Sequence, residues 1–259
     1  MIKAVIFDIG STLVHYKNPL NWQNLYKPAL EFVSEKCALN LSEKNYQDAI
    51  CILSEYNTRL VPREEEVTAT FIWNRIFAAW NKDKKLSDLQ LCKNTFFSFF
   101  NNDCFIYNDV LPFLLYLREK KIKTGTLSDV AYGLENEYAL KDIAPIFKYI
   151  DLPYTSNDVG FRKPNTKGLQ MIAQKLSVDV GQIMFIGDEE KMRDIMDGVE
   201  YAANYSDMRD AHSVREIEWC SKCNKGYFLT KNDLDKIPAD RNKWVCKHCQ
   251  EDKPNDTVG

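Results

Sequence analysis

Four side chains that could act together on a phosphate group are spread along the chain, each at or near the end of a short apolar run. They are Asp8, Ser128, Lys163 and Asp188. Carboxylate oxygens are the ligands that Mg²⁺ prefers, a lysine ammonium neutralises phosphate charge, and a serine hydroxyl can donate to a phosphate oxygen. These residue types together indicate a magnesium-and-phosphate site if the fold brings them to one place.

The segments around these residues predict a fold that does so. Strands are expected at residues 4–7, 122–127, 149–154 and 183–186, and helical patterns between them at 110–120, 134–140 and 166–176. Alternating strands and helices predict a Rossmann-like α/β fold, a parallel sheet with helices on both faces. The carboxyl ends of parallel strands share one edge, so Asp8, Ser128 and Asp188 should meet there with the loop that carries Lys163.

The first two of these strands are separated by a long segment without strand patterning. Apolar residues recur at helical spacing in residues 22–38, 42–60, 63–80 and 87–100. We therefore expect an inserted all-helical domain at 16–106, of the four-helix-bundle kind, and a core made of 1–15 and 107–212. A closing strand near 201–205 is only weakly indicated, because the surrounding sequence is polar.

The C-terminal segment carries four of the eight cysteines as two Cys-x-x-Cys pairs, which are Cys220, Cys223, Cys246 and Cys249. Two such pairs are typical of a zinc ribbon, in which four thiolates complete a tetrahedron; a rubredoxin-like iron site is the alternative. We expect a ribbon at 216–252 with structural Zn²⁺, because four thiolates leave no open coordination position. Acidic and basic residues balance in this segment, which favours a structural or protein-docking role over nucleic-acid binding.

Composition excludes several other classes. The 259 residues are 45% hydrophobic and 27% charged, with a net charge of −3, so nothing favours nucleic acid or an anionic membrane as partner. The longest apolar runs are too short to span a bilayer, and the N-terminus lacks the pattern of a signal peptide. The other cysteines are scattered, as in proteins of a reducing compartment, so we expect a cytoplasmic location.

Four motifs carry a family resemblance: FDIGSTL at 7–13, TLSD at 126–129, RKP at 162–164 and IGDEEKMRD at 186–194. In this order, with a helical insert after the first, the chain resembles the haloacid dehalogenase (HAD) superfamily, in its subgroup with a helical cap. The resemblance covers about residues 1–200 and implies an Mg²⁺-dependent hydrolase.

The resemblance also implies roles for single residues. Asp8 would be the nucleophile that forms an aspartyl-phosphate, and Ser128 and Lys163 would hold the transferring phosphoryl group. The implied Mg²⁺ ligands are Asp8, the backbone carbonyl of Gly10, Asp188 and Glu189. Asp194 lies farther from Asp188 than the last motif leads us to expect.

Gly10 is the main departure from the family pattern. Phosphatases of the family usually carry a second aspartate there, which protonates the leaving group and then activates water, and such assistance is worth about 10²–10⁴-fold. One interpretation is a phosphatase that uses His15, Tyr16, an insert residue or water instead and favours good leaving groups such as acyl phosphates or phosphoanhydrides. A second is non-phosphatase chemistry. A third is a catalytically impaired protein-interaction or regulatory module that docks through its zinc ribbon.

We favour the first interpretation: a cytoplasmic HAD-like phosphohydrolase that acts on a small phosphorylated metabolite. A membrane partner is not expected, nucleic acid is disfavoured, and a protein partner would bind at the ribbon. Candidate substrate contacts from the insert and its junction are Tyr16, Trp22, Arg59, Arg63 and Arg75.

Overall fold

The computed structural model describes residues 2–17, 21–82, 85–101, 103–187, 200–202, 214–219, 221–222, 226–230, 243 and 245. Within this part of the chain a five-stranded sheet has the order β5-β4-β1-β6-β7. Its strands are β1 (Ala4–Phe7), β4 (Lys123–Ser128), β5 (Leu152–Thr155), β6 (Ile183–Ile186) and β7 (Glu200–Ala202). Every neighbouring pair is parallel, which confirms the predicted α/β class.

Alternate residues of the central strand β1 belong to two separate apolar cores. Val5 and Phe7 pack with α5 (Val110–Glu119) and the 3₁₀ helix η3 (Lys141–Tyr149) on one face. Ala4 and Ile6 pack with α8 (Lys167–Leu176) on the other. All four residues are buried, as expected of a strand covered on both sides by helices.

The structure shifts some predicted boundaries. Strand β5 begins at Leu152 instead of residue 149, because η3 continues to Tyr149. The weak closing strand is the short β7, which begins one residue before its predicted start. Smaller elements complete the described core: η2 (Ala131–Gly133), α6 (Asn136–Ala139), α7 (Ser156–Val159) and η4 (Val180–Gln182).

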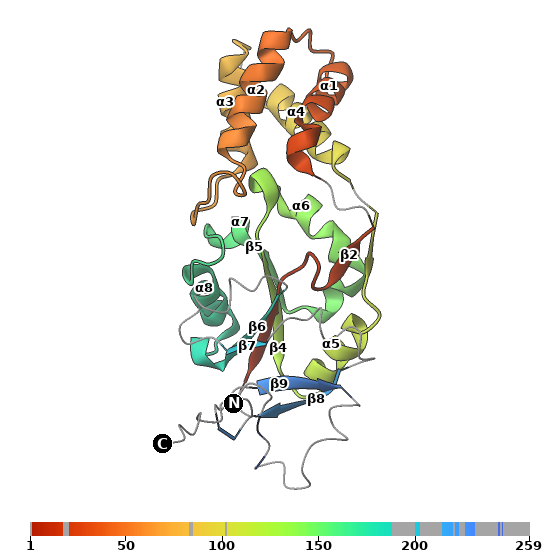
Figure 1. Ribbon diagram of the computed structural model, residues 1–259, viewed down its shortest axis with the longest axis vertical. Coiled ribbons are helices and arrows are strands. Elements are labelled where there is room, and N and C mark those ends of the chain that lie inside the picture. Colours follow the sequence, from red (N-terminus) through yellow and green to blue (C-terminus); the bar gives the residue numbers. More distant parts are fainter. Residues whose placement is uncertain are drawn as a thin grey trace, which may run out of the picture.

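The helical insert has an apolar core of its own, and Figure 1 shows its helices grouped at one end of the molecule, beyond the sheet. It contains η1 (Trp22–Leu25), α1 (Tyr26–Lys36), α2 (Glu43–Glu55), α3 (Ala69–Ala79) and α4 (Leu86–Phe99). The prediction of a helix from residue 63 is wrong at its start. Helix α3 begins after Thr68, whose side chain accepts from the backbone N–H of Phe71, and residues 63–67 are not helical.

Two short strands absent from the prediction join the insert to the core. The strands β2 (Val14–Tyr16) and β3 (Cys104–Ile106) pair antiparallel, where we expected a turn-prone connection from residue 15. Near the C-terminus, β8 (Val214–Trp219) and β9 (Gly226–Thr230) form a second antiparallel pair. No helix in the described ranges has the length and apolar character needed to span a membrane.

Candidate active site

Those predicted site residues that the structure describes lie at the carboxyl end of the sheet. Asp8 directly follows β1, and its backbone N–H donates to the carbonyl of Ile186 at the end of β6, at 2.8 Å. Ser128 ends β4, and Lys163 follows α7. A cavity of about 510 Å³ is lined by Asp8, Gly10, Ser128 and Lys163, so the structure brings these four residues together.

The centre of this cavity is an ion pair between Asp8 and Lys163. The ammonium of Lys163 donates to Oδ2 of Asp8 at 2.6 Å, and the side chains are 3% and 11% exposed for the lysine and the aspartate, respectively. The other carboxylate oxygen, Oδ1, accepts from the backbone N–H of Ile9 at 2.7 Å. Because both oxygens have a donor, the carboxylate is held in one orientation despite its burial.

Asp129 ties the loop of Lys163 to the end of β4. Its Oδ1 accepts from the backbone N–H of Lys163 at 3.0 Å, and Asp129 lines the same cavity. Burial raises the pKa of the Asp129 carboxyl, and the nearby cations of Lys163 and Arg162 oppose that rise. We assigned Asp129 no role from the sequence, although it directly follows Ser128.

The loop after Asp8 is folded back tightly on itself. The backbone N–H groups of Leu13 and Val14 both donate to the carbonyl of Ile9, and the N–H of Ser11 donates to the carbonyl of Val14. This turn places Gly10 at the cavity. A Cβ built on Gly10 would have the Tyr16 ring as its nearest neighbour, at 3.6 Å, an ordinary van der Waals contact.

The insert and its junction supply another part of the cavity lining. Of the five candidate contacts, Tyr16, Trp22 and Arg59 line the cavity, together with Phe97 and Phe100. Arg63 and Arg75 form ion pairs with Glu66 and Glu55 and do not belong to the lining. The hydroxyl of Tyr16 donates to Asp142 at 2.8 Å, and burial with this carboxylate neighbour raises the Tyr16 pKa.

The described residues contain part of an oxygen-donor set for a hard cation. They hold no cluster of three or more His, Cys, Asp or Glu side chains suited to a metal. The Asp8 carboxylate and the Gly10 carbonyl are nevertheless suitable oxygen donors at one cavity. Gly187 lies beside Asp8, since a Cβ at Gly187 would be 3.5 Å from the Asp8 Cβ.

The other predicted ligands cannot be placed in the same way. Asp188, Glu189 and Asp194 lie outside the described residues, as do Cys220, Cys223, Cys246 and Cys249. Their roles therefore stay predictions.

Comparison with known proteins identifies the family. The model of the haloacid dehalogenase-like hydrolases matches residues 2–193. The chain belongs to this family. The assignment confirms the expectation of a hydrolase-type enzyme and of HAD membership. Comparison with curated proteins gives no match.

Solved structures give a likeness of fold. A 2-haloacid dehalogenase from Pseudomonas syringae pv. Tomato DC3000 is 16% identical, with a TM-score of 0.50 and coverage of 78% of this chain and 86% of that one. A HAD phosphatase from Thermococcus onnurineus is 21% identical (TM-score 0.44, coverage 78% and 85%). A HAD family enzyme from Bacteroides thetaiotaomicron is 19% identical (TM-score 0.46, coverage 77% and 92%). The likeness to the first of these structures concerns the fold alone.

Proposed function

We propose that this protein is an Mg²⁺-dependent phosphohydrolase that acts on a small phosphorylated metabolite through an aspartyl-phosphate. The observation that carries the proposal is the Asp8 carboxylate, oriented by Lys163 and by the Ile9 N–H in a cavity that Ser128 also lines. A carboxylate with a fixed orientation and a neighbouring cation suits nucleophilic attack on an anionic phosphate.

The two chemical steps follow from this arrangement. In the first, an Asp8 oxygen forms a bond to phosphorus while the bond to the leaving-group oxygen breaks. In the second, water attacks the aspartyl-phosphate and releases inorganic phosphate and the free carboxylate. The Lys163 ammonium and the Ser128 hydroxyl stabilise the phosphoryl oxygens during both transfers. Bound Mg²⁺, held by Asp8, the Gly10 carbonyl, Asp188 and Glu189, would supply charge neutralisation that draws the carboxylate and phosphate together.

Because residue 10 is a glycine, we propose that the preferred substrates have good leaving groups. The side chain usual at this position would give the leaving oxygen its proton, and glycine has none to give. Tyr16 is a poor substitute, because its proton is already donated to Asp142 and its pKa is raised. His15 also lines the cavity and stays a candidate donor. Acyl phosphates and phosphoanhydrides need this assistance least.

The helical insert is proposed to act as the cap that selects the substrate. Trp22, Arg59, Phe97 and Phe100 bring both aromatic surface and one cation to the cavity. Among the described residues, the Arg59 guanidinium has no ion-pair partner, in contrast to Arg63 and Arg75. A substrate with a second anionic group would fit this lining.

The test of the proposed function is turnover with and without metal. We expect the purified protein with Mg²⁺ to hydrolyse acetyl phosphate and p-nitrophenyl phosphate, to lose this activity in EDTA, and to regain it when Mg²⁺ is restored. Release of inorganic phosphate measures both substrates. Absence of turnover on both substrates in Mg²⁺ would reject the phosphohydrolase proposal and favour the binding module, the alternative that Gly10 supports.

The C-terminal segment is proposed to form a structural zinc ribbon. Strands β8 and β9 pair with residue 219 opposite residue 226, so the connection between them contains the first Cys-x-x-Cys pair. An antiparallel hairpin is a suitable setting for a pair of thiolate ligands.

Metal analysis tests the ribbon. We expect about one zinc per chain, the stoichiometry of a four-thiolate site, and its loss in Cys220→Ser or Cys246→Ser. The matched control is Cys51→Ser, since Cys51 is an exposed free cysteine on α2 and should leave the zinc content unchanged. Zinc-free protein, or zinc retained in both ribbon variants, would contradict this assignment.

A further inference from the structure

A non-helical segment of the insert lies directly against the loop that carries Lys163. The backbone N–H of Arg162 donates to the carbonyl of Glu64 at 2.8 Å, and the N–H of Glu66 donates to the carbonyl of Gly160 at 2.9 Å. Glu65 and Phe161 thereby form an antiparallel bridge. The insert is thus hydrogen-bonded to Gly160 and Arg162, two of the three residues that precede Lys163.

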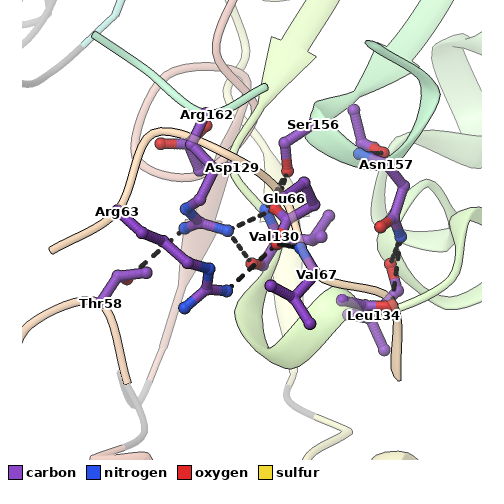
Figure 2. A network of polar contacts seen from close by, with 12 residues as sticks. Thr58, Arg63, Glu66, Val67, Asp129, Val130, Leu134, Ser156, Asn157 and Arg162 are labelled. Carbon is purple, nitrogen blue, oxygen red and sulfur yellow. Dashed lines mark hydrogen bonds and ion pairs between the residues drawn. The ribbon is translucent and has the colours of Figure 1, made fainter. Parts of the chain in front are cut away.

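The side chain of Glu66 is the centre of a buried polar network, shown in Figure 2. Its Oε2 accepts from the Arg162 guanidinium and from the Ser156 hydroxyl. Its Oε1 accepts from Arg63 at 3.1 Å and from the backbone N–H of Val67 at 2.9 Å. The side chains of Glu66 and Arg162 are only 2% and 7% exposed. A buried carboxylate with four donors is fully satisfied, and such networks rigidify the segments that they join.

Arg162 extends this network to the end of β4. Its Nη1 also donates to the carbonyl of Val130 at 2.7 Å, and the backbone N–H of Val130 donates to the Ser156 hydroxyl at 3.0 Å. Glu66 is therefore linked to the candidate site at two points. One is Val130, two residues after Ser128, and the other is Arg162, next to Lys163. Without the Glu66 charge, Arg162 would be a buried cation that lacks its principal counter-charge beside Lys163.

Other contacts hold the insert on the core independently of Glu66. The buried ammonium of Lys93 on α4 pairs with Glu135, and Tyr132 packs into the apolar core of the insert. Gly133 has a positive φ and lies so close to the start of α3 that a Cβ there would be 2.1 Å from the carbonyl oxygen of Val67. Loss of the Glu66 charge should therefore disturb the site without undocking the insert.

We propose that Glu66 is a positioning residue, whose carboxylate fixes Arg162 and thereby sets the placement of Lys163 and of residues 128–130. The role rests on the proposed phosphohydrolase function, in which Lys163 and Ser128 hold the transferring phosphoryl group. A residue of the insert would thus position the phosphate-binding residues of the α/β core.

Glu66→Gln tests this role, because it removes the charge and keeps the shape. We expect kcat on acetyl phosphate to fall about 10- to 10²-fold, since small misplacements of catalytic groups cost about that much. Arg162→Gln should do the same, and the double variant should lose no more than the worse single one, because both act through one contact. Glu66→Asp, which keeps the charge, should recover part of the loss. The matched control is Glu55→Gln, which breaks the exposed ion pair with Arg75 and should leave kcat unchanged.

A second measurement does not depend on turnover. Amide hydrogen exchange of residues 160–163 should be faster in Glu66→Gln than in the native protein, with no change in β1, well below the unfolding temperature. If the native protein has no activity, the proposed function fails while this measurement still tests Glu66. Native kcat together with native exchange at 160–163 would overturn the positioning role, as would a lower melting temperature with unchanged kcat.

Discussion

Asp8→Asn is expected to abolish turnover, with kcat on acetyl phosphate at least about 10³-fold below the native value, equivalent to about 4 kcal/mol of transition-state stabilisation. The amide cannot form the aspartyl-phosphate, so the covalent route is lost. The amide oxygen can still accept one of the two hydrogen bonds that Asp8 receives from Ile9 and Lys163. We therefore expect the variant to fold, with some loss of stability because the buried ion pair between Asp8 and Lys163 is lost.

The control for this substitution is Asp103→Asn. Asp103 is largely exposed and pairs with Lys17 at 3.9 Å, the kind of surface contact that contributes little. The kcat values of both variants report the loss of chemistry, and their circular dichroism spectra show whether they are folded. Retention of native kcat in Asp8→Asn would contradict the nucleophile assignment and, with it, the proposed mechanism.

The sequence predicts the sheet well where burial alone determines the element. Residues 4–7 and 183–186 are continuous apolar runs, and both are strands with those boundaries because the sheet buries them on two faces. The convergence of Asp8, Ser128 and Lys163 is predictable for a related reason. The common edge of parallel strands follows from topology and needs no knowledge of side-chain contacts.

The segment before α3 shows where local patterns are insufficient. Residues 63–66 read as the acidic first turn of a helix, yet they pair with residues 160–162. The hydrogen bonds and the buried Glu66–Arg162 pair join residues that are far apart in the chain, so no local propensity indicates them. Local patterns also fail to place Arg59 and Arg63. Helix α2 ends at Glu55, and the irregular chain that follows places Arg59 at the cavity and Arg63 against Glu66.

Gly10→Asp is expected to raise activity, whereas Asp8→Asn abolishes it. The new carboxyl would supply the proton that a poor leaving group needs, so turnover of an alkyl phosphate should rise about 10²–10⁴-fold, while acetyl phosphate should gain little. The loop has room for the change: Gly10 lacks the positive φ that would disfavour a side chain, and the nearest atom to its Cβ position is in the Tyr16 ring at 3.6 Å.

Gly10→Asn is the matched control, because it has nearly the same shape and cannot transfer the proton. A gain in the aspartate variant alone means that the pocket is otherwise competent and that Gly10 restricts it to good leaving groups. A gain in neither variant, with both folded, contradicts the interpretation that the missing acid is what limits the enzyme. Because the two variants differ in a single ionisable group at the cavity, their difference measures that group's contribution directly, and the ratio between alkyl and acetyl phosphate shows whether it acts on the leaving oxygen.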